Sequence, residues 1–453
     1  MQVAWRGSHV VARLIRSTGW VAFGYAASQA IRLLSNLLLT RILFPEAFGL
    51  MALINVFLIG LTMLSDIGVA PSIQQSKRGD EPDFVNTAWT LQVIRGAILW
   101  VACCVLGFWA AWFYDDPQLQ TMLPVAGLAL LITGFDPTRI LTASRHLALG
   151  RVTVLNLVSQ VISLVFMLAL AYIMRSVWAL VLGGVLAAIL KLVLMNVFLP
   201  GPKNRFLWSP DAAREIITFG KWIFLSTLCG FLLTQGDKAI LGKYISMEAL
   251  GIYNVGYFLA SFPQLMAATV LSQVMIPLYR EKPPGASAEN FASIRKIRFT
   301  LTFLVLSMQF VLAFSGIWLV DFLYDDDFLA SGGIVVVVAC MNIPYLIGMT
   351  YDYAALSQGD SRGVFILLLF KAVAQTSLFI LGMEMHGLIG ALFGLWLSQV
   401  LVHPVVIWLA HRHKAWDPLH DVIFAVAGLL TTVLILRFHW ADLDSLLSST
   451  FLQ

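Results

Sequence analysis

A ten-residue stretch occurs twice in this chain and organises the rest of the sequence around it. Residues 41–50 read RILFPEAFGL, and residues 243–252 read KYISMEALGI, 202 positions later. Each copy holds a cation, a Glu-Ala pair five residues further on, and then a glycine. Trp20 and Trp222 have the same offset. The repeat predicts a protein built from two related halves.

The sequence around these two copies is too apolar for a soluble protein. Of the 453 residues 59% are hydrophobic and only 12% are charged, whereas soluble chains carry about 25% charged residues. A helix needs about 20 mostly apolar residues to cross a bilayer. The chain holds thirteen such runs, at 18–40, 48–70, 87–112, 119–138, 152–174, 177–199, 216–235, 250–278, 299–320, 328–350, 363–382, 387–410 and 420–438.

The distribution of Lys and Arg gives these predicted spans an orientation. With the amino terminus in the cytoplasm, twenty of the twenty-nine cations fall on the cytoplasmic side, five fall outside and four lie within spans. Cytoplasmic loops of membrane proteins carry such an excess. A missing or spurious span would move every later loop to the other side, so the bias supports the topology through the twelfth span. Because no small-residue cleavage site follows the first apolar run, we expect an uncleaved start.

Six predicted spans separate the two copies of the repeat, so both halves have the same orientation in the membrane. Repeats of that sense are typical of transporters whose halves rock around a central site. We predict an all-α polytopic membrane protein with two six-helix bundles related by a pseudo-two-fold axis along the membrane normal, plus one extra carboxyl-terminal transmembrane helix. The predicted segments are an amphipathic amino terminus (1–17), bundles at 18–199 and 216–410 with a cytoplasmic linker (200–215), the extra helix (420–438) and a tail (439–453).

The four cations inside spans are the first candidates for function: Arg32, Arg95, Lys191 and Lys371. A cation at the bilayer centre costs about 2.5–3.5 kcal/mol, so it usually faces a partner or a wet cavity. Arg32 shares one helical face with Gln29 and Asn36, which predicts a polar stripe lining a water-filled cavity. A structural pair within the bundle is the alternative for Arg32. For the other three cations, the alternative is snorkelling toward the cytoplasmic face.

Candidate counter-charges stand near the cytoplasmic ends of spans, at Asp66, Asp136 and Asp352. Asp136 has the i, i+3 spacing for a pair with Arg139. Asp66 precedes an Ile-Gly turn, and Asp352, between two tyrosines, is a candidate gate residue. Asp66 and Asp352 are also candidates for ion coupling.

One histidine, His403, is predicted to lie at membrane depth, directly before a proline. An imidazole there could couple transport to protons, because its unperturbed pKa is about 6.5. The structural alternative is a neutral histidine that donates to the carbonyl freed by the proline.

Several classes of function are excluded or disfavoured by the same sequence. A net charge of +4 without a basic run argues against nucleic-acid binding. The four cysteines lie in apolar stretches and form no metal or redox motif, so we expect no cofactor beyond a coupling H⁺ or Na⁺. The longest predicted outer loop, 236–249, is too short for a catalytic domain, and Asp325, Asp326 and Asp327 face outward. We therefore expect a transporter rather than an enzyme.

Residues 39–53 (LTRILFPEAFGLMAL), with Asp66-Ile-Gly68 and Ile73-Gln-Gln75, resemble the opening of the Wzx-type polysaccharide exporters. These are lipid-linked oligosaccharide flippases of the multidrug/oligosaccharidyl-lipid/polysaccharide (MOP) superfamily, and the likeness is to the colanic-acid type. Residues 237–243 and 248–253 resemble the junction of that family's seventh and eighth spans. The resemblance covers roughly residues 15–410. Family members have twelve or fourteen spans with both ends cytoplasmic, whereas thirteen spans would place this carboxyl end outside.

The resemblance implies an alternating-access flippase that moves an undecaprenyl-pyrophosphate-linked oligosaccharide repeat unit from the cytoplasmic to the periplasmic leaflet of a bacterial inner membrane. The product would be a surface polysaccharide, whether exopolysaccharide, capsule or O-antigen. The expected partners are the lipid-linked oligosaccharide, membrane lipids, a polysaccharide polymerase and a chain-length regulator, and we expect the protein to function as a monomer. A cation-coupled drug exporter of the same superfamily and a membrane-embedded polymerase or ligase are the alternatives. The basic deep charges favour an anionic substrate.

Overall fold

The computed structural model describes residues 2–220 and 224–443, with backbone alone for 2–18, 21, 219, 220 and 224. Trp222 of the repeat and most of the predicted tail 439–453 lie outside the described residues. Every regular element in the described part of the chain is a helix, as predicted. The chain divides into two compact units, Met1–Leu228 and Cys229–Gln453.

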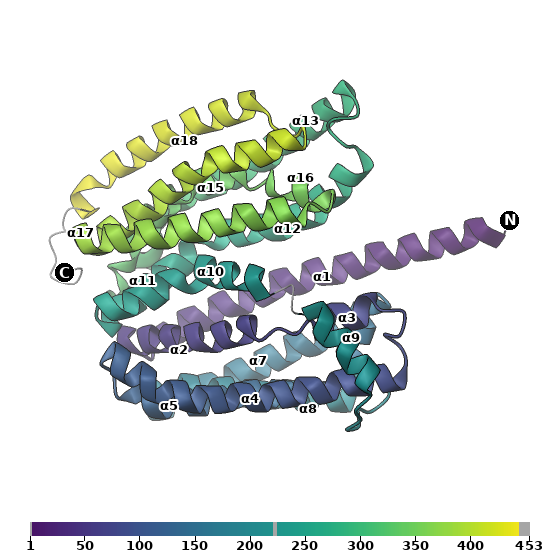
Figure 1. The fold of residues 1–453 in the computed structure, drawn as a ribbon. Helices are drawn as coiled ribbons and strands as arrows, with labels where there is room; N and C mark the ends of the chain where they lie inside the picture. Colours follow the sequence, from purple (N-terminus) through teal and green to yellow (C-terminus); the bar gives the residue numbers. More distant parts are fainter. Residues whose placement is uncertain (1, 221–223, 444–453) are drawn as a thin grey trace. The chain divides into compact units, whose positions relative to one another are not determined.

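The first unit is built from long antiparallel helices with short helices at their ends (Figure 1). α4 packs along α5, α7 along α8, and α1 against α7. α1 continues through the predicted amino-terminal segment 1–17 without a break. The elements of the first unit are α1 (Gln2–Thr40), α2 (Pro45–Leu64), α3 (Val69–Gln75), α4 (Pro82–Tyr114), α5 (Gln118–Gly134), α6 (Arg139–Arg145), α7 (Leu149–Met174), α8 (Trp178–Phe198) and α9 (Pro210–Gly220).

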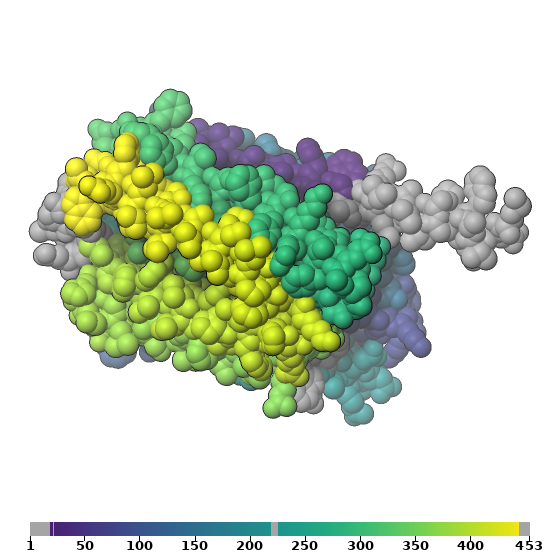
Figure 2. All heavy atoms as spheres, turned by 90° about the horizontal axis from the view of Figure 1, so that it is seen from above, coloured from purple at the N-terminus to yellow at the C-terminus, as the bar shows by residue number. Residues whose placement is uncertain are grey.

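The second unit repeats this architecture with more broken helices and one additional helix. Its elements are α10 (Phe224–Tyr244), α11 (Met247–Ala260), α12 (Phe262–Glu281), α13 (Ala288–Leu323), η1 (Asp326–Phe328), α14 (Ser331–Met341), α15 (Ile343–Gly348), α16 (Asp352–Ser357), α17 (Ser361–Arg412) and α18 (Pro418–Phe438). α18, the predicted extra helix, packs against α13 and α15. Figure 2 shows α18 in yellow on the surface between α13 and α17.

The repeated sequence forms the same structure in both units, a tight turn followed by a helix start. In the first copy the turn ends at Pro45, the first residue of α2. In the second copy the Ser246 hydroxyl accepts a hydrogen bond from the Ala249 N–H and caps α11. Glu46 and Glu248 both lie in the first turn, where the helix dipole favours negative charge. The repeat therefore encodes the connection between the first two long helices of each half.

The helices confirm a multi-pass membrane protein. Among the described residues, eight helices are long and apolar enough to cross a bilayer, or up to ten if each bent pair counts as one span. α17 contains two predicted spans, 363–382 and 387–410, because non-helical backbone at His386 and Gly387 divides it. The predicted span 250–278 is bent by 44° between α11 and α12. α1 contains the predicted span 18–40, and α10 covers the second part of the predicted span 216–235, but neither helix meets this criterion.

Residues 200–220 differ from the predicted linker and span start. Backbone N–H groups of Arg205, Leu207 and Ser209 donate to side chains of α4. The following helix α9 is amphipathic and buries Ala212 and Ile216 against α3 and α4. Ile216 therefore belongs to the buried face of a short helix packed on α4 (Figure 1), whereas Ile217 is exposed. The next long helix begins at Phe224, and the units separate after Leu228.

Candidate functional site

Arg32, the deepest cation of the first predicted span, lies on α1 with the polar stripe around it. Its Nη1 donates to Gln29 Oε1 at 3.3 Å, and Gln29 Nε2 donates to Tyr25 Oη at 3.1 Å. Gln29 is buried, Asn36 is half-buried and Arg32 itself is exposed. The i, i+3, i+7 stripe therefore presents its guanidinium at the surface of the first unit.

Arg95 is held by neutral oxygens at the end of α2. Its Nε donates to Ser65 Oγ at 3.0 Å and its Nη2 to the Thr62 carbonyl at 2.6 Å. Asp66, the next residue, lies near enough for an electrostatic attraction. Asp66 Oδ1 accepts from the Gly68 N–H at 2.9 Å and closes the turn into α3, where Gly68 adopts a φ of 71°. Asp66 thus has a structural role in this turn.

The two deep lysines form ion pairs with two of the candidate counter-charges. Lys191 Nζ lies 2.7 Å from Asp136 Oδ2, and Lys371 Nζ lies 2.7 Å from Asp352 Oδ2. The other oxygen of each carboxylate is buried and has no hydrogen-bond partner among the described residues. In each pair the acid lies where a helix is interrupted, Asp136 between α5 and α6 and Asp352 at the start of α16. The lysine lies in a neighbouring long helix, α8 or α17. Neither lysine snorkels alone, and both charges are compensated.

Arg139 does not pair with Asp136, although the spacing suggested it. Its Nη1 donates to the Leu199 carbonyl at 2.6 Å and its Nη2 to the Asn196 carbonyl at 2.9 Å. These are carbonyls at the end of α8, where a cation satisfies groups that the helix leaves unbonded. Arg139 therefore closes α8, and Asp136 is left to Lys191.

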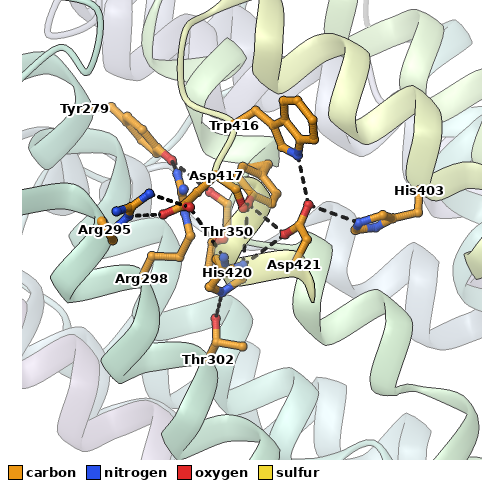
Figure 3. Close-up of polar contacts among 11 residues, drawn as sticks. Tyr279, Arg295, Arg298, Thr302, Thr350, His403, Trp416, Asp417, His420 and Asp421 are labelled. Carbon is orange, nitrogen blue, oxygen red and sulfur yellow. Dashed lines mark hydrogen bonds and ion pairs between the residues drawn. The ribbon is translucent and has the colours of Figure 1, made fainter. Parts of the chain in front are cut away.

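His403 faces a carboxylate rather than the carbonyl freed by the proline. Its Nε2 lies 3.4 Å from Asp421 Oδ2, in the first turn of α18. Asp421 also accepts from Tyr351 Oη at 2.8 Å and from Trp416 Nε1 at 3.0 Å. Figure 3 shows His403 and Trp416 reaching Asp421 from different sides.

A second set of polar residues continues this network toward α13. His420 Nδ1 lies 3.0 Å from Asp421 Oδ1, and its Nε2 lies 2.9 Å from Thr302 Oγ1. Arg298 is fully buried, donates to Tyr279 Oη and covers the Tyr351 ring. Arg295 binds Asp417 through two nitrogens, at 2.5 and 2.8 Å. We call these residues the Asp421 cluster: Tyr279, Arg295, Arg298, Thr302, Tyr351, His403, Trp416, Asp417, His420 and Asp421.

Asp417 is the amino-terminal cap of α18 and is buried. Burial by itself raises the pKa of its carboxyl group. Hydrogen bonds from the Arg295 guanidinium and the His420 N–H outweigh this effect and hold the pKa below its ordinary value. Asp417 is therefore a carboxylate at neutral pH.

Apart from His403, the charged members of this cluster do not follow from the sequence predictions. Arg298 counts there among the twenty cytoplasmic cations, and neither Asp417 nor Asp421 is a candidate. The available signal was the density of titratable residues at 417–421, directly before an apolar run. Among the described residues, no group of three or more His, Cys, Asp or Glu side chains is arranged to hold a metal ion.

A large apolar cavity lies wholly within the second unit. Its volume is about 890 Å³, and α14, α15, the second part of α17 and α18 line it. Its lining is almost entirely hydrocarbon, with residues such as Ile347, Leu392 and Leu429. His403 lies at its edge and connects it to Asp421.

Comparison with known proteins agrees with the architecture. A family model described as "Polysaccharide biosynthesis protein" matches residues 38–332. The teichuronic acid biosynthesis protein TuaB of Bacillus subtilis is 22% identical over 241 residues, which are 52% of this chain and 50% of TuaB. The lipopolysaccharide biosynthesis protein WzxC of Escherichia coli is 19% identical over 59% of this chain and 54% of WzxC. The chain thus spans about half the length of these curated relatives.

One further relative matches nearly end to end. The succinoglycan biosynthesis transport protein ExoT of Rhizobium meliloti is 20% identical over 439 residues, covering 93% of this chain and 86% of ExoT. The names of these three relatives describe two biosynthesis proteins and one biosynthesis transport protein.

Solved structures show the same fold at low sequence identity. The lipid II flippase MurJ in an inward closed conformation has a TM-score of 0.66 at 11% identity, over 95% of this chain and all of MurJ. An inward-facing multidrug MATE transporter of the MOP superfamily has a TM-score of 0.64 at 13% identity, over 85% of this chain and 94% of that one. These likenesses establish the two-lobed architecture and confirm the resemblance in the sequence. The chain belongs to the polysaccharide biosynthesis protein family and has the fold of the MOP superfamily.

Proposed function

We propose that this protein is an alternating-access flippase for a lipid-pyrophosphate-linked oligosaccharide, which it moves from the cytoplasmic to the periplasmic leaflet for surface polysaccharide synthesis. The observation that carries the proposal is the exposed guanidinium of Arg32 on the polar stripe of α1. A cation predicted to lie deep in a span and yet exposed can reach a charged ligand.

An anionic head group fits the described charges better than a cationic drug. Asp136 and Asp352 are each compensated by a lysine, so these deep carboxylates are not available as cation sites. Arg32 and Arg95 carry planar guanidinium groups, which match phosphate oxygens with two parallel hydrogen bonds. We assign the first contact with the pyrophosphate to Arg32, with Arg95 as a second, more enclosed cation.

The lysines take a different role in this proposal. Lys191 and Lys371 can bind phosphate only if their partners Asp136 and Asp352 release them, because a buried pair broken on one side leaves an uncompensated charge. We propose that the pairs exchange partners as substrate enters, so that Asp352 acts as a gate for Lys371.

The apolar cavity of the second unit suits a hydrocarbon chain. Its lining offers almost no hydrogen-bonding group, and an apolar chain there removes hydrocarbon from contact with water. We propose that it receives part of the lipid carrier while the head group is bound elsewhere.

Filling this cavity should slow transport. Thr432→Trp places an indole among the lining residues, where it occupies the space of a lipid chain. We expect a several-fold lower rate of flipping in liposomes, with unchanged protein abundance in the membrane. Leu430→Trp, on the same helix but outside the lining and already exposed, is the matched control. Equal rates for the two variants would remove the cavity from the transport path.

The remaining features of the proposal follow the sequence predictions. We place the protein in the bacterial inner membrane with a cytoplasmic amino terminus, acting as a monomer alongside a polysaccharide polymerase and a chain-length regulator. Transport is coupled to H⁺ or Na⁺. The drug-exporter alternative predicts efflux of organic cations, which the same liposomes would detect.

Depletion of the protein in its own host tests the function directly. We expect a lipid-linked oligosaccharide to accumulate, with its sugar in the cytoplasmic leaflet and inaccessible to lectin added to intact spheroplasts. The accumulated lipid also identifies the repeat unit. Continued appearance of labelled sugar on the outer leaflet at the normal rate, with the protein gone, would refute the proposal.

A further inference from the structure

The carboxylate of Asp421 collects hydrogen-bond donors from three separate parts of the second unit. Tyr351 reaches it from the segment before α16, His403 from α17, and Trp416 and His420 from the α18 end. Figure 3 shows His403, Trp416 and His420 converging on the Asp421 carboxylate. A buried carboxylate with this many partners holds the amino end of α18 against the other helices.

The two imidazoles that face Asp421 differ in what they can do. His420 is fully buried, and both of its ring nitrogens have partners, Asp421 on Nδ1 and Thr302 on Nε2. A neutral His420 satisfies this arrangement, because Nδ1–H donates to the carboxylate and Nε2 accepts from the hydroxyl. The permanent charge of Arg298 lies within electrostatic range and opposes a second cation there. His420 is therefore a neutral orienting group.

His403 is placed to take up a proton. Its side chain is 23% exposed and is among those that line the apolar cavity. Its Nε2 lies 3.4 Å from Asp421 Oδ2, longer than the roughly 2.7–2.9 Å of a charge-assisted N–H···O contact. Protonation of the ring would turn this long contact into an ion pair, so the distance leaves room for a tighter state.

The charges around this contact balance before a proton is added. Arg295 and Arg298 on α13 match Asp417 and Asp421 at the start of α18, and the phenols of Tyr279 and Tyr351 are neutral at physiological pH. His411, on the last turn of α17, lies against the Trp416 ring, at 5.9 Å between ring centroids. One proton on His403 thus changes the cluster from neutral to singly positive, with Asp421 as its nearest counter-charge.

We infer that His403 and Asp421 form a proton-binding site, and that a proton on His403 clamps the second part of α17 to the amino end of α18. This inference goes beyond the proposed function because it names H⁺ as the coupling ion and names the residues that bind it. The transport experiment below rests on the proposed function. Loss of the proton leaves only the weaker neutral contact, which frees α18 to move relative to α17.

The clamp is tested by amide hydrogen exchange of the α18 amino end in the full-length protein in lipid nanodiscs. Protection factors, corrected for intrinsic exchange, are compared at pH 5.5 and pH 8. Because a hydrogen bond to a charged group is stronger than a neutral one by about 1 kcal/mol, which is about a factor of five in an equilibrium constant, we expect about fivefold lower protection at the higher pH. His403→Gln should show low protection at both pH values, and His403→Lys high protection at both.

His411→Gln is the matched control, because it removes an exposed histidine from the same helix and should keep the wild-type pH response. A wild-type response in His403→Gln, or loss of the response in both histidine variants alike, would overturn the assignment.

Transport in proteoliposomes with an imposed pH gradient separates this inference from the proposed function. If the wild-type protein flips the lipid and His403→Gln loses the pH dependence, both stand. If the wild-type protein flips the lipid and His403→Gln keeps the same pH profile, proton binding at His403 is refuted while the flippase function stands. An unrelated lipid flippase serves as the positive control for the liposomes. If this control moves its lipid and the wild-type protein moves none, the proposed function fails, and the exchange measurement alone decides whether the clamp exists.

Discussion

Arg32→Glu is expected to reduce surface polysaccharide to the level of cells that lack the protein. The substitution replaces the exposed guanidinium of the α1 stripe with a negative charge. It removes hydrogen bonds to a charged ligand worth about 1.5–3 kcal/mol each and adds repulsion against a pyrophosphate. The measurement is surface polymer per cell, normalised to the amount of protein in the membrane fraction.

Two further variants make this experiment specific. Arg32→Lys keeps the charge but loses the planar fork that binds two oxygens, so we expect partial export between the wild type and Arg32→Glu. Arg175→Glu is the same reversal at an exposed position in the turn after α7, and export should persist. Full export by Arg32→Glu at normal abundance would eliminate Arg32 from the binding site.

Asp417→Asn is expected to cause the largest loss of stability among substitutions in the Asp421 cluster. The buried carboxylate caps α18 and binds Arg295 through two nitrogens. An amide cannot accept both charged contacts, so we expect a decrease of about 3 kcal/mol in the free energy of unfolding of the second unit. The exposed side of Arg295 keeps the loss below the upper range for fully buried pairs. Thermal unfolding in detergent micelles, followed by tryptophan fluorescence, measures it.

Asp360→Asn provides a comparison at a helix cap without a two-nitrogen arginine contact. Asp360 caps α17 through the Gly363 N–H at 2.9 Å, as Asp417 caps α18, and its other contacts are His413 at 3.0 Å and the exposed Arg412 at 3.8 Å. We expect a loss of about 1 kcal/mol or less there. Equal losses for the two variants would show that the Arg295 ion pair contributes nothing beyond the cap.

The pH dependence of this contribution has a defined sign. Because the pKa of Asp417 is lower in the folded protein than its ordinary value, its contribution is fully present above pH about 4 and is lost as the pH falls through the folded pKa. The wild type should therefore lose stability on acidification below pH about 4 more steeply than Asp417→Asn. Parallel curves for the two proteins would contradict the ion pair.

The sequence predicted the membrane architecture well, because the bilayer imposes local requirements. Each span needs a minimum apolar length, and each loop carries its positive charge on the proper side. The repeat at Arg41 and Lys243 encodes a turn and a helix start, which are also local structures. The two halves, the all-helical content and the extra helix α18 followed from these signals.

The boundaries of elements were harder where an apolar run is not a span. Ile216 continues an apolar segment along the sequence, but it is the buried face of α9 against α4. The tertiary neighbours decide which side of this helix is buried, and hydropathy along the chain does not contain that information. Where the apolar runs are spans, the structure follows the sequence: non-helical backbone at His386 and Gly387 divides α17 between the predicted spans 363–382 and 387–410.

The sequence by itself determined which charges would be embedded, because Arg32, Arg95, Lys191 and Lys371 stand out from apolar surroundings. It also gave Asp136 and Asp352 as candidate counter-charges, but only the tertiary structure assigned them to Lys191 and Lys371. The tertiary structure also brought His403 to Asp421 and buried Arg298. The physical reason is that an uncompensated buried charge costs free energy, so an embedded charge needs an opposite charge or a hydrogen-bonding group nearby. The packing of helices that are distant in sequence decides which group lies close enough.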